Sequence, residues 1–173
     1  MKTTDPQDEI FPIVNEEDQV KGKITRKEAH NSPHIIHRAI QVLVFNKDGK
    51  LLIQKRSLTK DTAPGCWSES VGGHVCNGEE YLPVDVREIQ EELGITVSPK
   101  NLQPLGKMIT VEPWEKEMTM VYKLSLRETP PLHPSPEEVS EVKFVDINTL
   151  KSMIKTQEWT PCSLQVFDKF ILK

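Results

Sequence analysis

The stretch GHVCNGEEYLPVDVREIQEELGI, residues 73–95, decides the fold of this chain. Pro83 has no backbone N–H and suits a first helical turn, so a helix is expected to begin near Glu80 or Tyr81. Gly94 stands where a residue in the left-handed conformation commonly ends a helix. The stretch therefore predicts a loop that leads into an amphipathic helix. Its buried stripe is expected to consist of the apolar residues at helical spacing, Leu82, Val86, Ile89 and Leu93.

The expected helix, residues 81–93, carries three carboxylates on one face. Glu88, Glu91 and Glu92 stand at positions i, i+3 and i+4, which are neighbours on a helix surface. Like charges this close repel unless a cation neutralises them, and Mg²⁺ prefers oxygen ligands while keeping waters and substrate phosphates. A glutamate-rich helix taken alone is more often a solvated acidic face, so both interpretations stay open at this point.

The spacing of the polar residues in this stretch resembles the signature of the Nudix hydrolase family. That signature is a glycine, five residues, a glutamate, seven residues, and then Arg-Glu-aliphatic-x-Glu-Glu-x-Gly-aliphatic. At ordinary residue frequencies such a match arises by chance at about 10⁻⁹ per starting position. Every specified position matches, namely Gly73, Glu79, Arg87, Glu88, Ile89, Glu91, Glu92, Gly94 and Ile95.

The resemblance implies an α+β Nudix fold, in which a mixed β-sheet is sandwiched between α-helices. It implies that Glu88, Glu91 and Glu92 bind Mg²⁺ or Mn²⁺, with Gly73 assigned to the same metal site. Arg87 is expected to support catalysis by orienting a glutamate through an ion pair. The metal would polarise phosphorus and help to generate hydroxide for in-line attack. The implied enzyme is a pyrophosphohydrolase that cleaves the diphosphate linkage of a nucleoside diphosphate derivative or a similar organic diphosphate.

The similarity extends, over roughly residues 26–164, to the Nudix-related isopentenyl-diphosphate isomerases. HRAIQVLVFNKDGKLLIQKRS (residues 37–57) and the PGCW loop (residues 64–67) carry this part of the likeness. Imidazole and carboxylate ligands together suit Mn²⁺ or Zn²⁺ better than Mg²⁺. Each histidine alone is more often a packed or surface side chain than a ligand, so a metal here is one of two open interpretations. The isomerases hold a metal with three histidines and two glutamates, and the matching positions here are His30, His37, His74, Glu115 and Glu117.

Basic positions that hold the diphosphate in the isomerases recur here at Arg26, Arg56 and Lys60, although solvated surface charge is the alternative. Two positions differ from the isomerases at residues that take part in isomerisation. The position of the isomerases' catalytic cysteine is Gly72, and the position of a tryptophan that stabilises a carbocation is Cys162. A glycine has no side chain to transfer a proton, so hydrolysis is favoured. An isomerase-like enzyme and a non-catalytic diphosphate-binding module are the alternatives.

The composition indicates an ordinary soluble protein that acts on a small molecule. The 173 residues suit one domain, taken as a single Nudix domain over 1–173 with residues 1–9 frayed. The net charge of −4 argues against nucleic-acid binding, and no apolar run approaches the roughly 20 residues of a membrane helix. Acidic residues near the N-terminus and three widely spaced cysteines favour a reducing cytoplasm. The expected partner is a small-molecule diphosphate, without nucleic acid or membrane, and the oligomeric state is unknown.

Turn and strand patterns place further elements on both sides of the signature. Apolar runs flank the Asp-Gly turn at residues 46–49, which predicts a β-hairpin. Asp146 is expected to cap a helix that runs to Ile154, and Thr160-Pro161 to begin another over 162–172. Further strands are expected at residues 11–14, 68–75, 107–111, 118–126 and 142–145.

Overall fold

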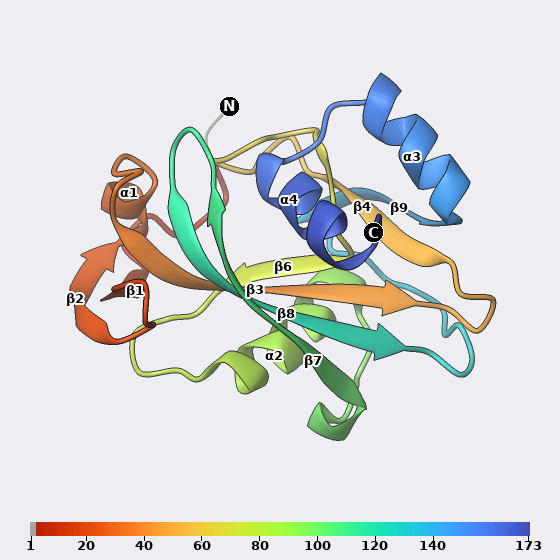
Figure 1. Ribbon diagram of the computed structural model, residues 1–173, viewed down its shortest axis with the longest axis horizontal. Coiled ribbons are helices and arrows are strands. Elements are labelled where there is room, and N and C mark those ends of the chain that lie inside the picture. Colours follow the sequence, from red (N-terminus) through yellow and green to blue (C-terminus); the bar gives the residue numbers. More distant parts are fainter. Residues whose placement is uncertain (1–2) are drawn as a thin grey trace.

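The computed structural model describes residues 3–173, and its strands form one mixed sheet (Figure 1). The central strand β3 (Ile36–Phe45) is antiparallel to β1 (Ile10–Val14), β4 (Leu51–Arg56) and β6 (Val71–His74), and parallel to β8 (Lys116–Ser125). The sheet is extended by β2 (Val20–Thr25) beside β1, by β5 (Trp67–Ser68) and β9 (Val139–Val145) beside β4, and by β7 (Leu102–Val111) beside β8.

Helices cover both faces of this sheet (Figure 1). Ile40 on β3 packs in the core beneath α2 (Tyr81–Leu93), whereas Leu43 packs with α3 (Ile147–Thr156) and α4 (Pro161–Phe170). Side chains alternate across a strand, so β3 supplies apolar groups to both cores. A mixed sheet between helices confirms the expected α+β architecture. Two short helices complete the described chain, α1 (Arg26–Ala29) and the 3₁₀ helix η1 (Pro99–Asn101).

The limits of the signature helix agree with the sequence prediction. Helix α2 begins at Tyr81, with Pro83 in its first turn. It ends at Gly94, which has φ +69° and donates its N–H to the carbonyl of Gln90 at 3.0 Å. A Cβ at position 94 would lie 2.8 Å from His133, so a side chain is excluded by both conformation and space.

The buried side of α2 differs from the expected stripe. Ile89 and Leu93 are fully buried as predicted, but Leu82 and Val86 are only partly buried. The helix is turned so that other positions face the sheet, because tertiary packing decides between overlapping apolar faces. The buried residues are Tyr81, Val84, Asp85, Ile89, Glu92 and Leu93.

The other predicted elements are present, with shifted limits. The hairpin turns at residues 46–49, with Gly49 at φ +74°. Asp146 caps α3 by accepting from the N–H of Thr149 at 2.9 Å, and α4 begins at Pro161. Strand β7 starts at Leu102, ahead of the expected residue 107. Strand β2 and helix α1 were not predicted, because residues 20–29 are mostly polar and show no clear period.

The prediction that the N-terminal residues fray is wrong for residues 3–9. Asp5 is buried and accepts from the backbone N–H of Asp61 at 2.8 Å. Its carboxylate also pairs with Lys60 at 2.5 Å and with Arg26 at 3.2 Å. These contacts with distant parts of the chain hold the segment in place. Residues 1 and 2 of the same prediction lie outside the described residues.

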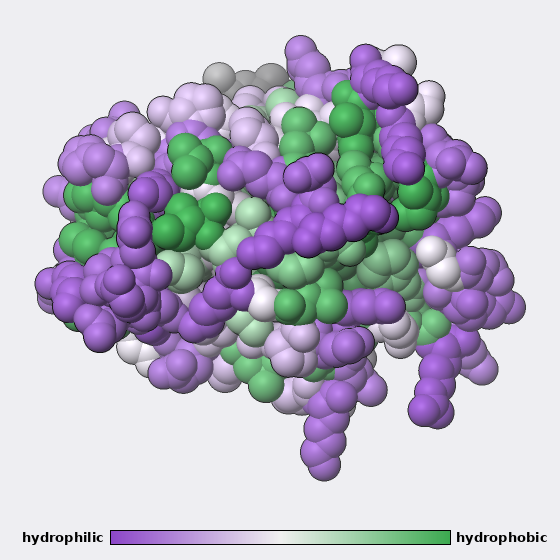
Figure 2. Space-filling model, viewed as in Figure 1, coloured by the Kyte–Doolittle hydropathy of each residue, from purple (hydrophilic) through white to green (hydrophobic). Residues whose placement is uncertain are grey.

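Hydrophilic residues cover most of the face seen in Figure 2, with hydrophobic residues grouped near α3 and α4. Partly buried side chains such as Met153 and Leu164 pack there against the second core. Among residues 3–173, no helix combines the length and the apolar character needed to cross a membrane.

Candidate active site

A cavity of about 420 Å³ lies beside β6, within the size range of ligand pockets. Strand β6 brings two successive glycines to this cavity, and they face opposite ways because strand side chains alternate. A Cβ at Gly73 would lie 2.5 Å from the side chain of Glu88, on the α2 side. A Cβ at Gly72 would lie 2.5 Å from Oε1 of Glu69, on the other side. The cavity therefore reaches acidic groups on both faces of β6.

The three glutamates of α2 all line this cavity. Glu92 is buried and accepts from the Gln54 amide at 2.9 Å, and burial raises its pKa well above its usual range. Burial also raises the pKa of Glu88 to about 7, despite an ion pair with Arg87 at 3.0 Å. The side chain of Glu91 is 53% exposed. Burial thus favours the protonated form of two of the three carboxyls unless a cation compensates their charge.

The first glycine of the signature is required by the packing of Glu88. The Cγ, Cδ and Oε1 atoms of Glu88 lie 2.5–2.6 Å from the position that a Cβ on residue 73 would occupy. Any side chain there would displace the carboxylate, so Gly73 lets the α2 glutamate lie directly on the β6 backbone.

Arg87 forms the ion pairs that the sequence predicts. Its Nη1 lies 3.0 Å from Glu88 and 3.1 Å from Glu91, and its Nη2 lies 3.6 Å from Glu79. Glu79 in turn accepts from the backbone N–H of Cys76 at 3.0 Å. The charged residues of the signature therefore form one connected set that ties the loop to the helix.

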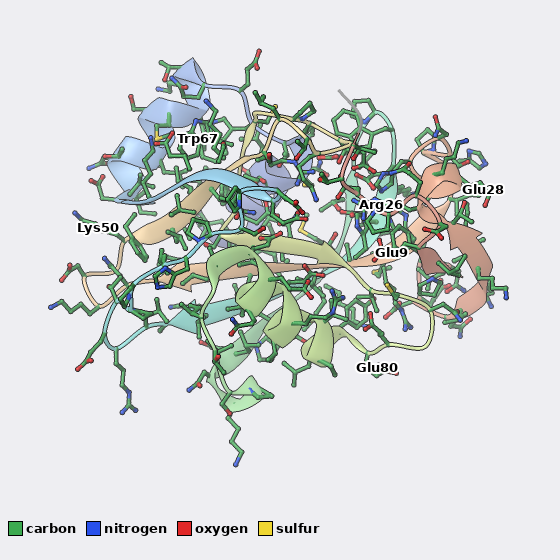
Figure 3. The ribbon with its side chains drawn as sticks, turned by 180° about the vertical axis from the view of Figure 1, so that it is seen from behind. Glu9, Arg26, Glu28, Lys50, Trp67 and Glu80 are labelled. Atoms are coloured by element: carbon green, nitrogen blue, oxygen red, sulfur yellow. The ribbon has the colours of Figure 1, made fainter. Side chains whose placement is uncertain are left out.

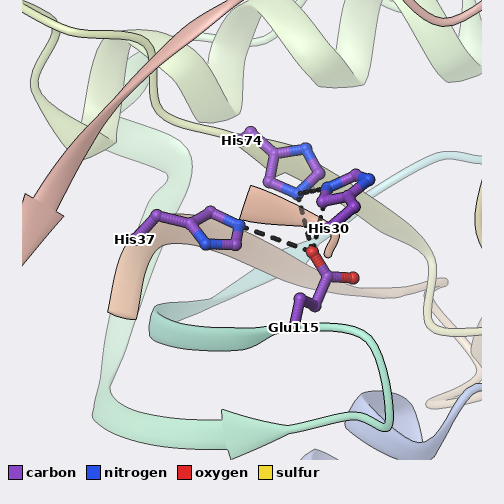
Figure 4. A group of neighbouring side chains, drawn as sticks. All are labelled: His30, His37, His74 and Glu115. Atoms are coloured by element: carbon purple, nitrogen blue, oxygen red, sulfur yellow. Dashed lines mark hydrogen bonds and ion pairs between the residues drawn. The ribbon is translucent and has the colours of Figure 1, made fainter. Parts of the chain in front are cut away.

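The three histidines and two glutamates converge as predicted, and Figure 4 shows four of them, His30, His37, His74 and Glu115. The Oε2 atom of Glu115 lies 3.0 Å from Nε2 of His30, 3.4 Å from Nε2 of His37 and 3.5 Å from Nε2 of His74. Oε1 of Glu117 is 3.3 Å from the same atom of His74. Strands β3, β6 and β8 and the end of α1 bring these side chains together. We call this group the His/Glu cluster.

Electrostatics in the His/Glu cluster favour a mixture of charged and neutral groups. Burial disfavours a charged His30, but the nearby carboxylates of Asp61 and Glu115 raise its pKa to about 9. Burial lowers the pKa of His74 to about 4 and also lowers that of His37. Within the described chain, neither ring nitrogen of His37 has a hydrogen-bond partner, and neither has Oε2 of Glu115. Buried polar atoms without partners are costly, and a cation would satisfy them.

The basic residues expected to bind diphosphate line the cavity, but two are already neutralised. Arg26 is buried and pairs with Asp5, Glu9 and Asp61 at 2.9–3.2 Å, and Figure 3 shows Glu9 and Arg26 side by side. These carboxylates raise its pKa against the opposing effect of burial. Arg26 therefore reaches the cavity with its charge already compensated by carboxylates of the chain.

Lys60 and Arg56 differ in whether a carboxylate of the chain neutralises their charge. Lys60 is enclosed by Asp5 at 2.5 Å and by Glu138 at 2.6 Å, so its charge is also compensated within the chain. The Nε and Nη2 of Arg56 donate to Thr62, at 3.1 and 2.9 Å from its carbonyl oxygen. No carboxylate of the described chain forms an ion pair with Arg56. Of the three predicted basic residues, Arg56 is therefore the one whose charge is available to a ligand.

Residues 35–168 match the model of the NUDIX domain. The chain belongs to the Nudix family. An isopentenyl-diphosphate Delta-isomerase of Klebsiella pneumoniae is 31% identical over 151 residues, covering 85% of this chain and 81% of that protein. An uncharacterized Nudix hydrolase of Pseudomonas aeruginosa is 31% identical over 163 residues, 94% of each chain. The crystal structure of DR0079 from Deinococcus radiodurans has a TM-score of 0.79 at 26% identity, covering 95% of this chain and 100% of that one.

The Nudix cavity also contains polar residues that the sequence did not single out. Gln41 and Glu69 are buried in its wall, and Glu112 lies near the start of α4. Glu112 accepts from the backbone N–H of Cys162 at 3.0 Å, and the Ser163 hydroxyl donates to Glu69. Burial raises the pKa of Glu69 to about 7 and that of Glu112 to about 8. None of these residues has a motif spacing, so no pattern in the sequence marks them.

Proposed function

We propose that this Nudix protein is a metal-dependent hydrolase that cleaves the diphosphate linkage of an organic diphosphate. Glu88, Glu91 and Glu92 would hold Mg²⁺ or Mn²⁺, since hard cations prefer carboxylate oxygens. The observation that carries the proposal is that Glu88 and Glu92, two carboxyls whose pKa values are raised by burial, line a ligand-sized cavity together with Glu91. A divalent cation is the group that such a site fits.

Each supporting residue has a defined task in this proposal. The bound metal would polarise the phosphorus centre and lower the pKa of an attacking water. Arg87 holds Glu88 and Glu91 in place through its ion pairs. Gly73 leaves room for Glu88 against the β6 backbone. Arg56 is the cation proposed to bind a phosphate oxygen, for which guanidinium geometry is well suited.

Arg26 and Lys60 are proposed to act on the site indirectly. They neutralise the carboxylates of Asp5, Glu9, Asp61 and Glu138, which would otherwise add negative charge to the cavity and repel a diphosphate. We therefore assign them to maintaining the electrostatic balance of the pocket and keep direct phosphate contact for Arg56.

A second metal is proposed at the His/Glu cluster. Its unpartnered nitrogen and oxygen atoms fit a borderline cation such as Mn²⁺ or Zn²⁺. The Nδ1 of His30 lies 3.1 Å from Asp61, an arrangement that commonly orients a ligating imidazole through its second nitrogen. Such a cluster is also the observation that favours an isomerase-like enzyme as the second candidate function.

The surroundings of Gly72 argue against isomerisation. The place that a side chain at position 72 would enter is taken by the Glu69 carboxylate. Cys162 lines the cavity, but burial together with Glu69 and Glu112 raises its pKa well above the usual range. Cys76 contacts Glu9 at 3.6 Å, and burial raises its pKa to about 12. Neither thiol is suited to deliver a proton to carbon at neutral pH.

Two assays on the same metal-loaded preparation separate the candidates. We expect phosphate or pyrophosphate release from at least one member of a panel of nucleoside diphosphates and their sugar derivatives. We expect no incorporation of deuterium when isopentenyl diphosphate is incubated in heavy water. Deuterium incorporation at a catalytic rate would support the isomerase instead. Binding of diphosphates without either reaction would indicate a non-catalytic binding module.

A further inference from the structure

The wall of the cavity opposite α2 contains two buried polar side chains with unused hydrogen-bonding capacity. Gln41 on β3 is 3% exposed and Glu69 is 4% exposed, and both line the cavity. The register of the sheet pairs Gln41 with Gly72, so the Gln41 side chain lies on the same face of the sheet as the missing Gly72 side chain. Glu69 is beside that same glycine. Gln41, Glu69 and Gly72 therefore form one patch, which we call the Gly72 patch.

The unused capacity of the Gly72 patch is specific. Oε1 of Gln41 is buried and has no hydrogen-bond partner in residues 3–173. Oε2 of Glu69 accepts from the Ser163 hydroxyl, which fixes the direction of the carboxylate. Oε1 of Glu69 is the atom that faces position 72. Buried polar groups are almost always satisfied, so an unpartnered amide oxygen beside a carboxylate in the wall of a cavity points to a ligand.

A glycine at position 72 makes this arrangement possible. The distance of 2.5 Å from a built Cβ to Oε1 of Glu69 is shorter than real contacts allow. Any larger residue at position 72 would push the Glu69 carboxylate away or close the space in front of it. Gly72 has no side chain that could transfer a proton, and its small size leaves room for the Glu69 carboxylate, a hydrogen-bond acceptor, at the pocket.

The polarity of the patch selects the kind of group that can occupy it. An apolar chain would leave Gln41 and Glu69 desolvated without partners, at a cost for each buried group. A heterocycle with an exocyclic amino group would donate to Glu69 and use both functions of the Gln41 amide. Carboxylates accept from amino groups on bases, and carboxamides pair with adjacent donor and acceptor atoms on a base edge.

We propose that Gln41 and Glu69 determine specificity by reading an amino-substituted heterocycle on the substrate, and that Gly72 provides the room for it. This inference rests on the proposed function, because it concerns the non-phosphate half of the same diphosphate. The patch discriminates against prenyl diphosphates, whose hydrocarbon cannot satisfy it. It also discriminates against oxo analogues, which present a carbonyl acceptor to the Glu69 acceptor.

The test uses pairs of nucleotides in which an amino group beside a ring-nitrogen acceptor is exchanged for an oxo group beside a ring N–H. The values of kcat/KM are compared for ADP against IDP and for CDP against UDP. For at least one pair we expect the amino member to be favoured by about tenfold or more, as a buried direct contact to a base edge provides. Glu69→Gln should remove or reverse the preference, because a carboxamide can donate to the oxo group. Glu141→Gln, on an exposed part of β9, is the matched control and should keep the parent's preference.

A binding experiment keeps this inference separate from the hydrolase proposal. Monophosphates contain no diphosphate linkage, so calorimetric titrations with AMP against IMP and CMP against UMP report recognition even if no diphosphate is cleaved. Loss of the amino preference in Glu69→Gln in these titrations supports the inference whatever the hydrolysis assay shows. Equal affinities for amino and oxo members in the parent would overturn it. An unchanged preference in the variant, or a preference for isopentenyl diphosphate over every nucleotide, would also overturn it.

Discussion

Replacing Asp85 should change how the stability of the protein depends on pH. Asp85 is fully buried on α2, and neither carboxylate oxygen has a hydrogen-bond partner in the described part of the chain. Burial, together with the nearby charge of Glu88, raises its pKa from 3.8 to about 9. The folded state therefore keeps a proton that the unfolded state loses above the ordinary pKa. Because the folded state binds more protons, this carboxyl destabilises the protein progressively as pH rises between the two values.

The size of the effect follows from the same two pKa values. Each pH unit in this window lowers the contribution of Asp85 to the free energy of unfolding by about 1.4 kcal/mol. Between pH 5 and pH 7 this contribution therefore falls by about 3 kcal/mol. An asparagine is nearly isosteric and does not titrate. We expect Asp85→Asn to exceed the parent's free energy of unfolding by about 2 kcal/mol at pH 5 and by about 4 kcal/mol at pH 7, because the unfolded state loses the proton from pH 3.8 upward.

Urea denaturation at several pH values between 5 and 8 measures this difference. The experiment is done with a chelator present, because a cation at Glu88 would alter the potential at Asp85. Asp48→Asn, in the exposed hairpin turn, is the matched control and should follow the parent at every pH. Parallel stability curves for the parent and Asp85→Asn would show that the Asp85 carboxyl finds a partner or water, and would refute the reasoning.

Three further predictions concern the cavity. Gly73→Ala would place a Cβ 2.5 Å from the Glu88 side chain and so displace the Glu88 carboxylate. This displacement should lower the rate of phosphate release by about 10²-fold, while circular dichroism should show that α2 is intact. An unchanged rate would contradict the packing argument. Arg26→Ala should lower the free energy of unfolding by about 3–5 kcal/mol, because it leaves buried carboxylates unpaired. A raised KM with unchanged stability would instead show that Arg26 binds a phosphate of the substrate. Manganese bound by the parent should fall on acidification, because ligating imidazoles must be neutral; elemental analysis of a His37→Ala, His74→Ala double variant should find less metal, and equal content would rule out the His/Glu cluster as a metal site.

Helix α2 and the loop before it were predictable because their determinants are local. Glycine, proline and apolar spacing fix the ends of α2, and the positions of Glu88 and Arg87 follow from helix geometry. The family resemblance then indicated which distant histidines belong together, and their convergence depends on strands that the resemblance also implies. Only the side of α2 that faces the sheet was misjudged, since two overlapping apolar faces compete.

The remaining site residues depend on contacts that no local pattern encodes. Glu69 is positioned by Ser163, which is 94 residues away in the sequence. Gln41 faces the cavity because of the register between β3 and β6, and a shift of one residue would turn it to the other face. Arg26 has the charge expected of a phosphate ligand, but its neutralisation by Asp5 and Asp61 arises only when three separate segments meet.

The proposed hydrolase is tested most directly by the rate of phosphate release in Mg²⁺ from the best substrate of the panel. Glu91→Gln and Glu92→Gln are compared with Glu80→Gln, an exposed position at the N-terminal end of the same helix. Removing a carboxylate from a preorganised electrostatic site costs about two orders of magnitude or more, so the first two variants should lose that much turnover while remaining folded. Glu80→Gln should retain the parent rate. Equal rates in all three variants would show that the α2 glutamates do not hold the catalytic metal, and would contradict the proposed function.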